Sequence, residues 1–239
     1  YMFWEYYVMG IILIPGIIFA LIAQSKVNSS FNKWSTIQSA CGLTGEQVAR
    51  KILDENGLTN ITIIRTNGTL TDYYDNKKQI IALSNGVANS SSIASIGVAM
   101  HEVGHALQYK NNYFPIKLRN FIIPITNFVS SMLWPLVIIG CLFNFWLIPN
   151  SIFGMVILWI AVVSFSLAVL FNLVTLPVEY NASKRALSVL QSNNILHDEE
   201  LAGAKEVLNS AALTYVAALL VAILNLLRFV LVFFRNRDD

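Results

Sequence analysis

Four long apolar stretches alternate with mixed segments along the chain. They cover Tyr6–Ala23, Phe121–Trp146, Ile152–Leu176 and Ala211–Phe234. A helix needs about 20 residues to cross the hydrocarbon core of a bilayer, so each stretch is long enough to span it. The first stretch has neither the basic start nor the small-residue cleavage pattern of a signal peptide, so we expect it to be a retained anchor. The pattern predicts four transmembrane helices.

The segment between the first and second spans has the mixed pattern of a small globular module. Thr44 followed by Gln47 is typical of a capping box and predicts a helix that runs to about Asn56. Ile61–Arg65 and Gln79–Ser84 have the composition of β-strands. The fold class predicted is therefore an α-helical membrane protein with four transmembrane helices and a small α+β module.

A further helix is predicted after Ser90–Ser92, which can cap its start. Apolar and small residues recur beyond it at helical spacing: Ile93, Ile96, Gly97, Met100, Gly104 and Leu107. His101 and His105 lie on the neighbouring stripe of the same helix, so the two imidazoles are expected on one face.

These elements divide the chain into five segments. They are a first transmembrane helix (1–23), a soluble module with the histidine helix (24–117), a transmembrane hairpin (118–176), a helical segment (177–210), and a last transmembrane helix with its tail (211–239). The turn Leu147–Ser151 is so short that the hairpin must return the chain to the face it left.

Composition agrees with a membrane protein. Of 239 residues, 55% are hydrophobic and only 13% are charged, against about 25% charged in a typical soluble domain. The net charge of +2 and the lack of a Lys/Arg cluster argue against nucleic acid as a partner. Cys41 and Cys141 cannot supply a cysteine-rich metal site or a disulfide framework. The lipid bilayer is the partner that the composition predicts, whereas the oligomeric state is left open.

The stretch AMHEVGHALQ (Ala99–Gln108) carries the main chemical signal. Two histidines four residues apart on a helix can ligate one ion, and Glu102 beside the first can serve as a general base. This HExxH arrangement is typical of zinc-dependent hydrolases. The alternative is a histidine pair that merely forms polar surface, but Gly104 and Ala106 favour close approach by another segment. The chain has no GxSxG motif and no glycine-rich phosphate loop.

A catalytic zinc usually has three protein ligands and an open position. Glu179 is the better candidate for the third ligand, because the hairpin brings it back to the face where His105 precedes the second span. His197 and the acidic run Asp198–Glu200 stay open alternatives, although that run is typical of a solvated helix start.

At the level of motifs, the chain resembles the YugP-like family of bacterial membrane neutral zinc metallopeptidases, and more distantly the HtpX-type membrane proteases. The matching pieces are LTDYYD (Leu70–Asp75), HEVGHALQ (His101–Gln108), LPVEYNASKRAL (Leu176–Leu187) and ALTYVA (Ala212–Ala217). The resemblance implies a zincin-like module with one Zn²⁺ per chain.

The resemblance also assigns roles to residues. It implies that His101, His105 and Glu179 hold the zinc and that Glu102 is the base. Ser183 stands where the HtpX-type relatives carry an aspartate, so a hydroxyl would have to orient the ligand there.

Further roles are weaker expectations. Tyr215, Tyr180 and Arg185 are candidate oxyanion donors because they lie near the matched motifs, although each can also be an interfacial aromatic or a surface charge. The segment Gln79, Ile80, Ile81, Ala82, Leu83 and Ser84 could be an edge strand that accepts an extended substrate, or equally a buried core strand.

Taken together, these patterns predict a membrane-anchored zinc endopeptidase that cleaves membrane or membrane-proximal proteins. The alternatives are a zinc-binding scaffold without catalysis, and a transporter or channel, which the near absence of charge in the spans disfavours. Most lysines and arginines that flank the spans lie on the side of the module, against Arg235 and Arg237 near the C-terminus. This bias predicts a multi-pass protein of the bacterial cell membrane with a cytoplasmic module.

Overall fold

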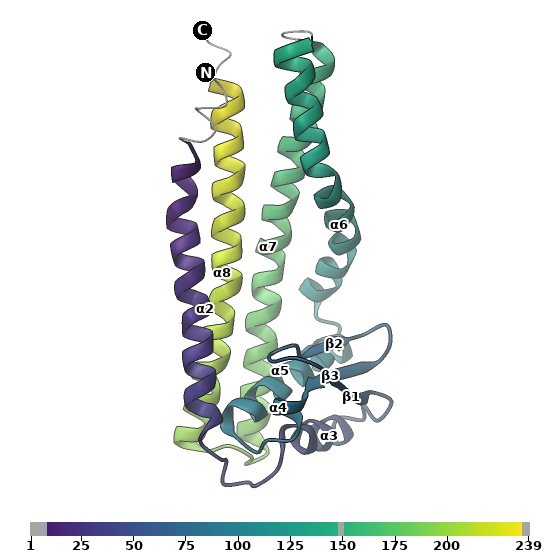
Figure 1. The fold of residues 1–239 in the computed structure, drawn as a ribbon. Coiled ribbons are helices and arrows are strands. Elements are labelled where there is room, and N and C mark those ends of the chain that lie inside the picture. The colour runs from purple at the N-terminus through teal and green to yellow at the C-terminus, as the bar shows by residue number, and fades with distance from the viewer. Residues whose placement is uncertain (1–8, 148–150, 236–239) are drawn as a thin grey trace. The chain divides into compact units, whose positions relative to one another are not determined.

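The fold is taken from a computed structural model that describes residues 9–147 and 151–235 (Figure 1). Parts of the predicted first span (residues 6–8), of the hairpin turn (148–150) and of the C-terminal tail, with Arg237, lie outside the described residues. The chain divides into two units. One holds residues up to Leu21, Lys117–Leu176 and residues from Tyr215 on, and the other holds Ile22–Ile116 and Pro177–Thr214.

The first unit consists of helix segments. The helices that enter it are η1 (Met9–Leu13), α2 (Ile14–Ser35), α6 (Phe114–Cys141), the π-helical η2 (Leu142–Leu147), α7 (Ile152–Ser192) and α8 (Asp198–Arg235). Four helical spans are long and apolar enough to cross a membrane, as predicted. Their apolar side chains are largely exposed, as in Phe121, Trp134 and Val163, which is the arrangement expected of helices solvated by lipid rather than by water.

Close helix contacts hold this unit together. A methyl group on Gly140 would lie 3.0 Å from Ile157, so α6 and α7 pack as the predicted hairpin. The rings of Phe165 and Phe229 lie 5.1 Å apart and join α7 to α8. Small residues at such contacts let helix backbones approach in lipid, where no hydrophobic effect drives association.

The second unit is an α+β module. Besides the unit's portions of α2, α7 and α8, it contains α3 (Gly45–Glu55), β1 (Thr62–Thr66), β2 (Tyr73–Asp75), β3 (Ile80–Ser84), α4 (Asn85–Ala88) and α5 (Ile93–Lys110). The capping box of Thr44 and Gln47 is present at the start of α3, and Ser92 caps α5, both as predicted. The core packs α3, the sheet and α5 around Ile52, Ile81 and Met100.

The strand order distinguishes between the two alternatives that the sequence left for Gln79–Ser84, an edge strand or a buried core strand. The sheet runs β1-β3-β2, with β3 parallel to β1 and antiparallel to β2. The predicted strand Gln79–Ser84 is therefore the central strand rather than an edge strand, since its backbone is already paired on both sides from Ile80 to Ala82. The edges are formed by β1 and by β2, a three-residue strand that the sequence did not predict. Tyr74 of β2 contacts Tyr109 of α5 edge to face.

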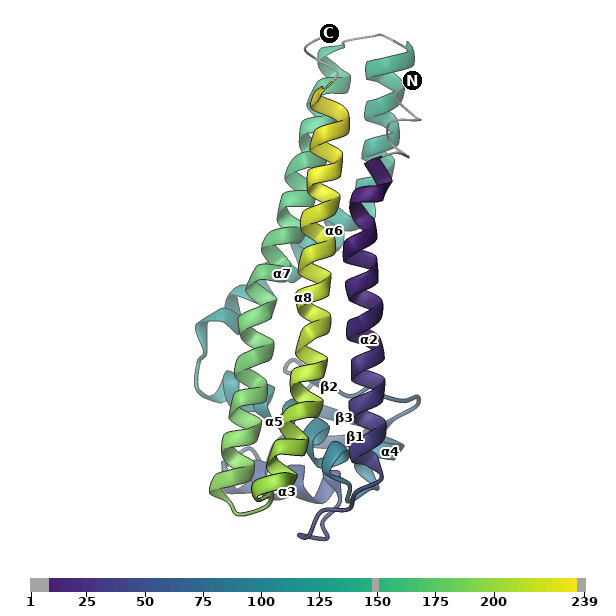
Figure 2. The ribbon, with the colours of Figure 1, turned by 90° about the vertical axis from the view of Figure 1, so that its left-hand side faces the viewer.

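Helices α7 and α8 are longer than predicted. Each runs unbroken through both units, α7 to Ser192 and α8 from Asp198 (Figures 1 and 2). The helical segment expected at 177–210 is thus the end of one helix and the beginning of the next. Pro177 does not end α7, because a proline removes only one backbone donor and neighbouring segments can support the turn.

Helix α5 meets α7 at a glycine. A methyl group on Gly104 would lie 2.4 Å from the backbone oxygen of Ala182, closer than any side-chain carbon can approach. Elsewhere on α5, a methyl group on Gly97 would meet Ala204 of α8 at an ordinary 3.5 Å. Gly104 therefore sets how closely α5 and α7 can pack.

We expect Gly104→Ala to push α5 away from α7. The change should lower the free energy of unfolding by roughly 1–3 kcal/mol, the usual cost of overpacking, and should weaken metal binding by residues on the two helices. Thermal unfolding and metal content of the purified protein measure both effects. Gly97→Ala is the control on the same helix: its contacts with Ala204 are ordinary, so it should keep its metal and be as stable as the wild type or more stable by up to about 1 kcal/mol, because alanine favours helix over glycine. Equal destabilisation of the two variants would contradict this account of the contact.

Candidate metal centre

Helix α5 presents His101 and His105 on one face. The residues lie one turn apart, and their rings pack edge to face with centroids 4.8 Å apart. Both side chains are mostly buried, with 16% of His101 and 11% of His105 exposed. Because the helix begins at a capped Ser92 and runs through Lys110, the rigid middle of α5 fixes this spacing.

Glu179 of α7 completes a group of three potential ligands. Its Oε2 atom lies 3.2 Å from Nε2 of His101 and 3.5 Å from Nε2 of His105. One ligand atom from each of the three residues lies within 4.8 Å of the others. The Glu179 residue is only 2% exposed, so its carboxylate needs a compensating positive charge in a site of this kind.

The other ring nitrogen of each histidine is held by a side chain. Nδ1 of His105 lies 3.0 Å from Oε1 of Gln108, and Nδ1 of His101 lies 3.1 Å from Oγ of Ser183. A histidine that uses Nδ1 in a hydrogen bond presents Nε2 to a metal with a fixed ring orientation. Both Nε2 atoms point in this way toward Glu179.

Gln108 fixes the tautomer of His105. Its amide nitrogen donates to the backbone oxygen of Val178 (2.7 Å) and to Oδ1 of Asn181 (3.1 Å). Oε1 of Gln108 is then left to accept, so Nδ1 of His105 carries a proton, and Nε2 is the nitrogen that faces Glu179 and could bind a metal ion. Gln108 is fully buried, and the loss of any partner would leave a polar group unsatisfied.

The network continues along α7 from Asn181 to Arg185. Nε of Arg185 donates to Oδ1 of Asn181 at 2.8 Å, and its guanidinium lies over the ring of Tyr113 at 5.7 Å. Asn181 Oδ1 therefore accepts hydrogen bonds from both Arg185 and Gln108. Arg185 is thus linked to His105 through Asn181 and Gln108, and the oxyanion role considered from the sequence stays a prediction.

Glu102 lies beside the ligand group on α5. It is 7% exposed. Burial raises the pKa of its carboxyl, the neighbouring His101 and His105 lower it, and the negative charges of Glu179 and Asp72 raise it further; the net shift is upward. A carboxyl with a raised pKa holds a proton more readily than an exposed one, which suits a group that accepts a proton and passes it on.

Asp72 joins the site region from the loop before β2. Its carboxylate accepts hydrogen bonds from the backbone nitrogen of Ser84 at 2.7 Å and from the hydroxyl of Ser84. Burial raises the pKa of Asp72, while these hydrogen bonds lower it, with a net upward shift. Asp72 fixes the junction between β3 and α4, and it is close enough to act electrostatically on Glu102.

The donor set fits a catalytic zinc ion. Two imidazole nitrogens and one carboxylate oxygen form the His₂Glu set that leaves a further coordination position for water or substrate. The fit does not rest on residue types alone, since both Nε2 atoms converge on one oxygen and both Nδ1 atoms already have hydrogen-bond partners. His101, His105 and Glu179 could hold the ion.

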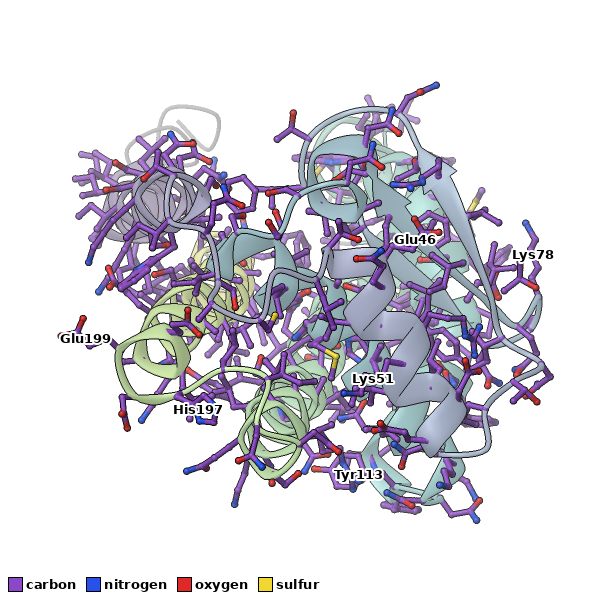
Figure 3. The ribbon with its side chains drawn as sticks, turned by 90° about the horizontal axis from the view of Figure 1, so that it is seen from below. Glu46, Lys51, Lys78, Tyr113, His197 and Glu199 are labelled. Atoms are coloured by element: carbon purple, nitrogen blue, oxygen red, sulfur yellow. The ribbon has the colours of Figure 1, made fainter. Side chains whose placement is uncertain are left out.

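The remaining alternatives for the third ligand lie elsewhere. His197 is exposed at the connection between α7 and α8, where Figure 3 labels it with Glu199. The acidic run forms the first turn of α8, and Glu200 accepts a hydrogen bond from the backbone nitrogen of Ala40 at 2.7 Å. Among the described residues, the group that could hold a metal contains Glu179 and not His197.

The contacts of the other two candidate oxyanion donors, Tyr180 and Tyr215, do not test that role. Tyr180 is 43% exposed and lines a groove with residues of α2 and α8. Tyr215 belongs to the other unit, so its role stays a prediction. Ser183, considered as an orienting residue, does contact His101.

Sequence reasoning missed Gln108 and Asn181. A weak signal for Gln108 was present, because it follows His105 by three residues on one helix face. No comparable signal marked Asn181, since its role depends on where α7 crosses α5.

We expect Ser183→Ala to weaken metal binding without unfolding the module. Nδ1 of His101 would lose its partner, and loss of such a partner typically lowers metal affinity by about 10- to 100-fold. Competition with a chelator of known affinity measures the change. Ser188→Ala, an exposed serine on the same helix, is the control, and unchanged affinity in Ser183→Ala would exclude an orienting role for the hydroxyl.

Comparison with known proteins gives a consistent match. The family model described as "Putative neutral zinc metallopeptidase" covers residues 9–234. The chain is also 43% identical over 218 residues to the "Putative membrane protease YugP" of Bacillus subtilis (strain 168), which covers 91% of this chain and 92% of that protein. No solved structure matches the chain. Because the family model spans nearly all of the sequence and includes both α5 and α7, the chain belongs to this neutral zinc metallopeptidase family.

Proposed function

We propose that this chain is a membrane-anchored, zinc-dependent endopeptidase with one zinc ion held by His101, His105 and Glu179. The observation that carries the proposal is the convergence of both Nε2 atoms on the buried Oε2 of Glu179. Family membership supports the same activity. The four apolar helices imply contact with lipid, and membership of a peptidase family implies a peptide substrate.

In the proposed reaction, the chain's own residues hold the ion, orient it and move a proton. When bound, zinc supplies Lewis acidity, which activates water at neutral pH and polarises the carbonyl of the peptide bond. The Glu102 carboxylate takes a proton from the attacking water and delivers it to the nitrogen of the leaving amine. Its burial beside the two histidines keeps the proton within the site between these transfers.

The residues around the histidines prepare this chemistry. Gln108 holds His105 in the tautomer that leaves Nε2 free, and Ser183 supports His101. A ligand set that is oriented before substrate arrives avoids reorganisation during the reaction. Asn181 and Arg185 extend the support of His105 along α7.

We further propose that the substrates are membrane proteins or segments close to the membrane. Glu179 follows the apolar stretch that ends at Leu176 by three residues, and both lie on the unbroken helix α7. A ligand so close to the end of a span keeps the reaction near the lipid surface. The bias of lysine and arginine toward the module favours a cytoplasmic location for it.

Glu179→Ala should abolish stoichiometric zinc binding, because it removes the only carboxylate in the ligand group of the described residues. Metal analysis of the purified variant beside the wild type measures the loss. His197→Ala is the matched control and should keep its zinc. Zinc retained by Glu179→Ala and lost by His197→Ala would overturn the assignment of the third ligand.

Glu102→Gln should separate catalysis from metal binding. The amide cannot accept the proton of the attacking water, so peptide hydrolysis should fall by about 10²- to 10⁴-fold while zinc content is unchanged. A membrane-protein substrate cleaved by the wild type in reconstituted vesicles provides the assay. Glu199→Gln, in the exposed first turn of α8, should keep full activity. Equal hydrolysis by wild type and Glu102→Gln would exclude Glu102 as the general base, whereas zinc binding without hydrolysis by the wild type would favour a zinc-binding scaffold instead.

A further inference from the structure

A groove on the second unit lies outside the metal centre. It has a volume of about 570 Å³ and is formed by residues of α2, α7 and α8. Its polar lining comprises Lys26, Tyr180, Lys205, Glu206, Asn209 and Ser210. Two lysines, a phenol, an amide and a hydroxyl provide donors toward one concave surface, which is the composition of an anion site rather than of an apolar pocket.

The charge of the groove is positive because its one acidic group is already paired. Oε2 of Glu206 accepts from Nζ of Lys33 at 2.9 Å and from Nε1 of Trp34 at 2.9 Å. Lys33 therefore balances the carboxylate from outside the lining. Lys26 also acts electrostatically on Glu206, but Lys26, Lys33 and Lys205 together outnumber this one carboxylate, so the groove keeps a net positive charge.

The lining also changes polarity in one direction along α8. Ala202, Lys205, Glu206, Asn209, Ser210 and Leu213 recur at helical spacing and form one stripe. The stripe passes from charged residues through an amide and a hydroxyl to Leu213, which is followed after Thr214 by the apolar part of α8. A phospholipid has the same gradient, from a charged headgroup to a hydrocarbon chain.

The groove lies where three helices approach their apolar portions. Lys26 is four residues beyond Ile22, Tyr180 three beyond Pro177, and Ser210 four before Thr214, the positions where these helices change units. A helix rises about 1.5 Å per residue. Along its own helix, each of the three residues therefore lies within about 6 Å of the position where that helix passes from one unit to the other. In a helix that spans a bilayer, this is the depth of the lipid headgroups.

From these observations we propose that the groove binds the phosphate of an anionic phospholipid headgroup, with Lys26 and Lys205 as its charged contacts. Basic pockets between membrane helices are suited to such headgroups. Lysine binds phosphate as a point charge and tolerates varied geometry. Tyr180, Asn209 and Ser210 add hydrogen-bonding groups to the site. The proposal concerns binding and does not depend on peptidase activity.

The test measures thermal unfolding of the full-length protein in a neutral detergent with added lipid. Phosphatidylglycerol should raise the midpoint by on the order of 5 °C more than phosphatidylcholine with the same acyl chains. The variant Lys26→Gln/Lys205→Gln should lose this difference, with an apparent lipid affinity at least tenfold lower. The control variant Lys51→Gln/Lys78→Gln removes the same charge from two exposed lysines of the same unit, which Figure 3 labels. It should keep the difference in midpoint between the two lipids.

Further measurements distinguish a phospholipid headgroup from free phosphate as the bound anion. Inorganic phosphate at the same concentration should give less than a tenth of the shift; an equal shift would identify a free phosphate site and overturn the lipid proposal. Equal stabilisation by both lipids, or equal loss in both double variants, would overturn it as well. Zinc content and the midpoint without lipid verify that each variant is folded. If Lys26→Gln/Lys205→Gln is not folded by these two criteria, the single variant Lys26→Gln is tested with the same lipids and with inorganic phosphate.

Discussion

A carboxylate buried between two imidazoles is the constraint on which the second unit depends. Glu179 is 2% exposed and has Nε2 of His101 and His105 as near neighbours. Burying a carboxylate costs several kcal/mol unless opposite charge and hydrogen bonds offset it. Against the effect of burial, the two imidazoles lower the pKa of Glu179, and Glu179 in turn contributes to raising the pKa of His105; a divalent cation shared by the three groups would supply further positive charge. A metal ion held by these groups would therefore couple its binding to the stability of the α5–α7 contact.

The same contact determines the precision of the ligand set. Gly104 lets the backbone of α5 approach Ala182 of α7 without a side chain between them. Two of the proposed ligands lie within one turn of this crossing, His105 on α5 and Glu179 on α7. A helix crossing held by backbone contact leaves little freedom for the distance between the ligands, which is the condition for a preorganised site.

Local sequence signals predicted those parts of the fold that depend on neighbouring residues. The capping box at Thr44 and the cap at Ser92 are formed as predicted, because each involves residues three apart. The histidine helix followed from its periodicity in the same way. The central position of β3 could not be predicted, since strand order depends on pairing between segments far apart in sequence. The three residues of β2 were too few to give a period.

Long-range contacts also explain what was missed in the site. Gln108 was visible in the motif but its partners Val178 and Asn181 lie on α7, so its role required the crossing of two helices. The continuation of α7 past Pro177 was hidden for a related reason. A proline is a strong local signal for the end of a helix. Tertiary contacts made by the residues that follow it can override that signal.

The two histidines proposed as ligands differ in how firmly their protonation is fixed. Gln108 has both amide hydrogens engaged, so its oxygen must accept from Nδ1 of His105. The hydroxyl of Ser183 can either donate or accept, so it orients His101 without imposing one tautomer. A carboxylate at position 183 would impose one tautomer on His101 and would increase the basicity of its imidazole. With serine there, His101, the more exposed of the two rings, stays the more adjustable ligand, and the rigidity of the centre comes from the side of His105.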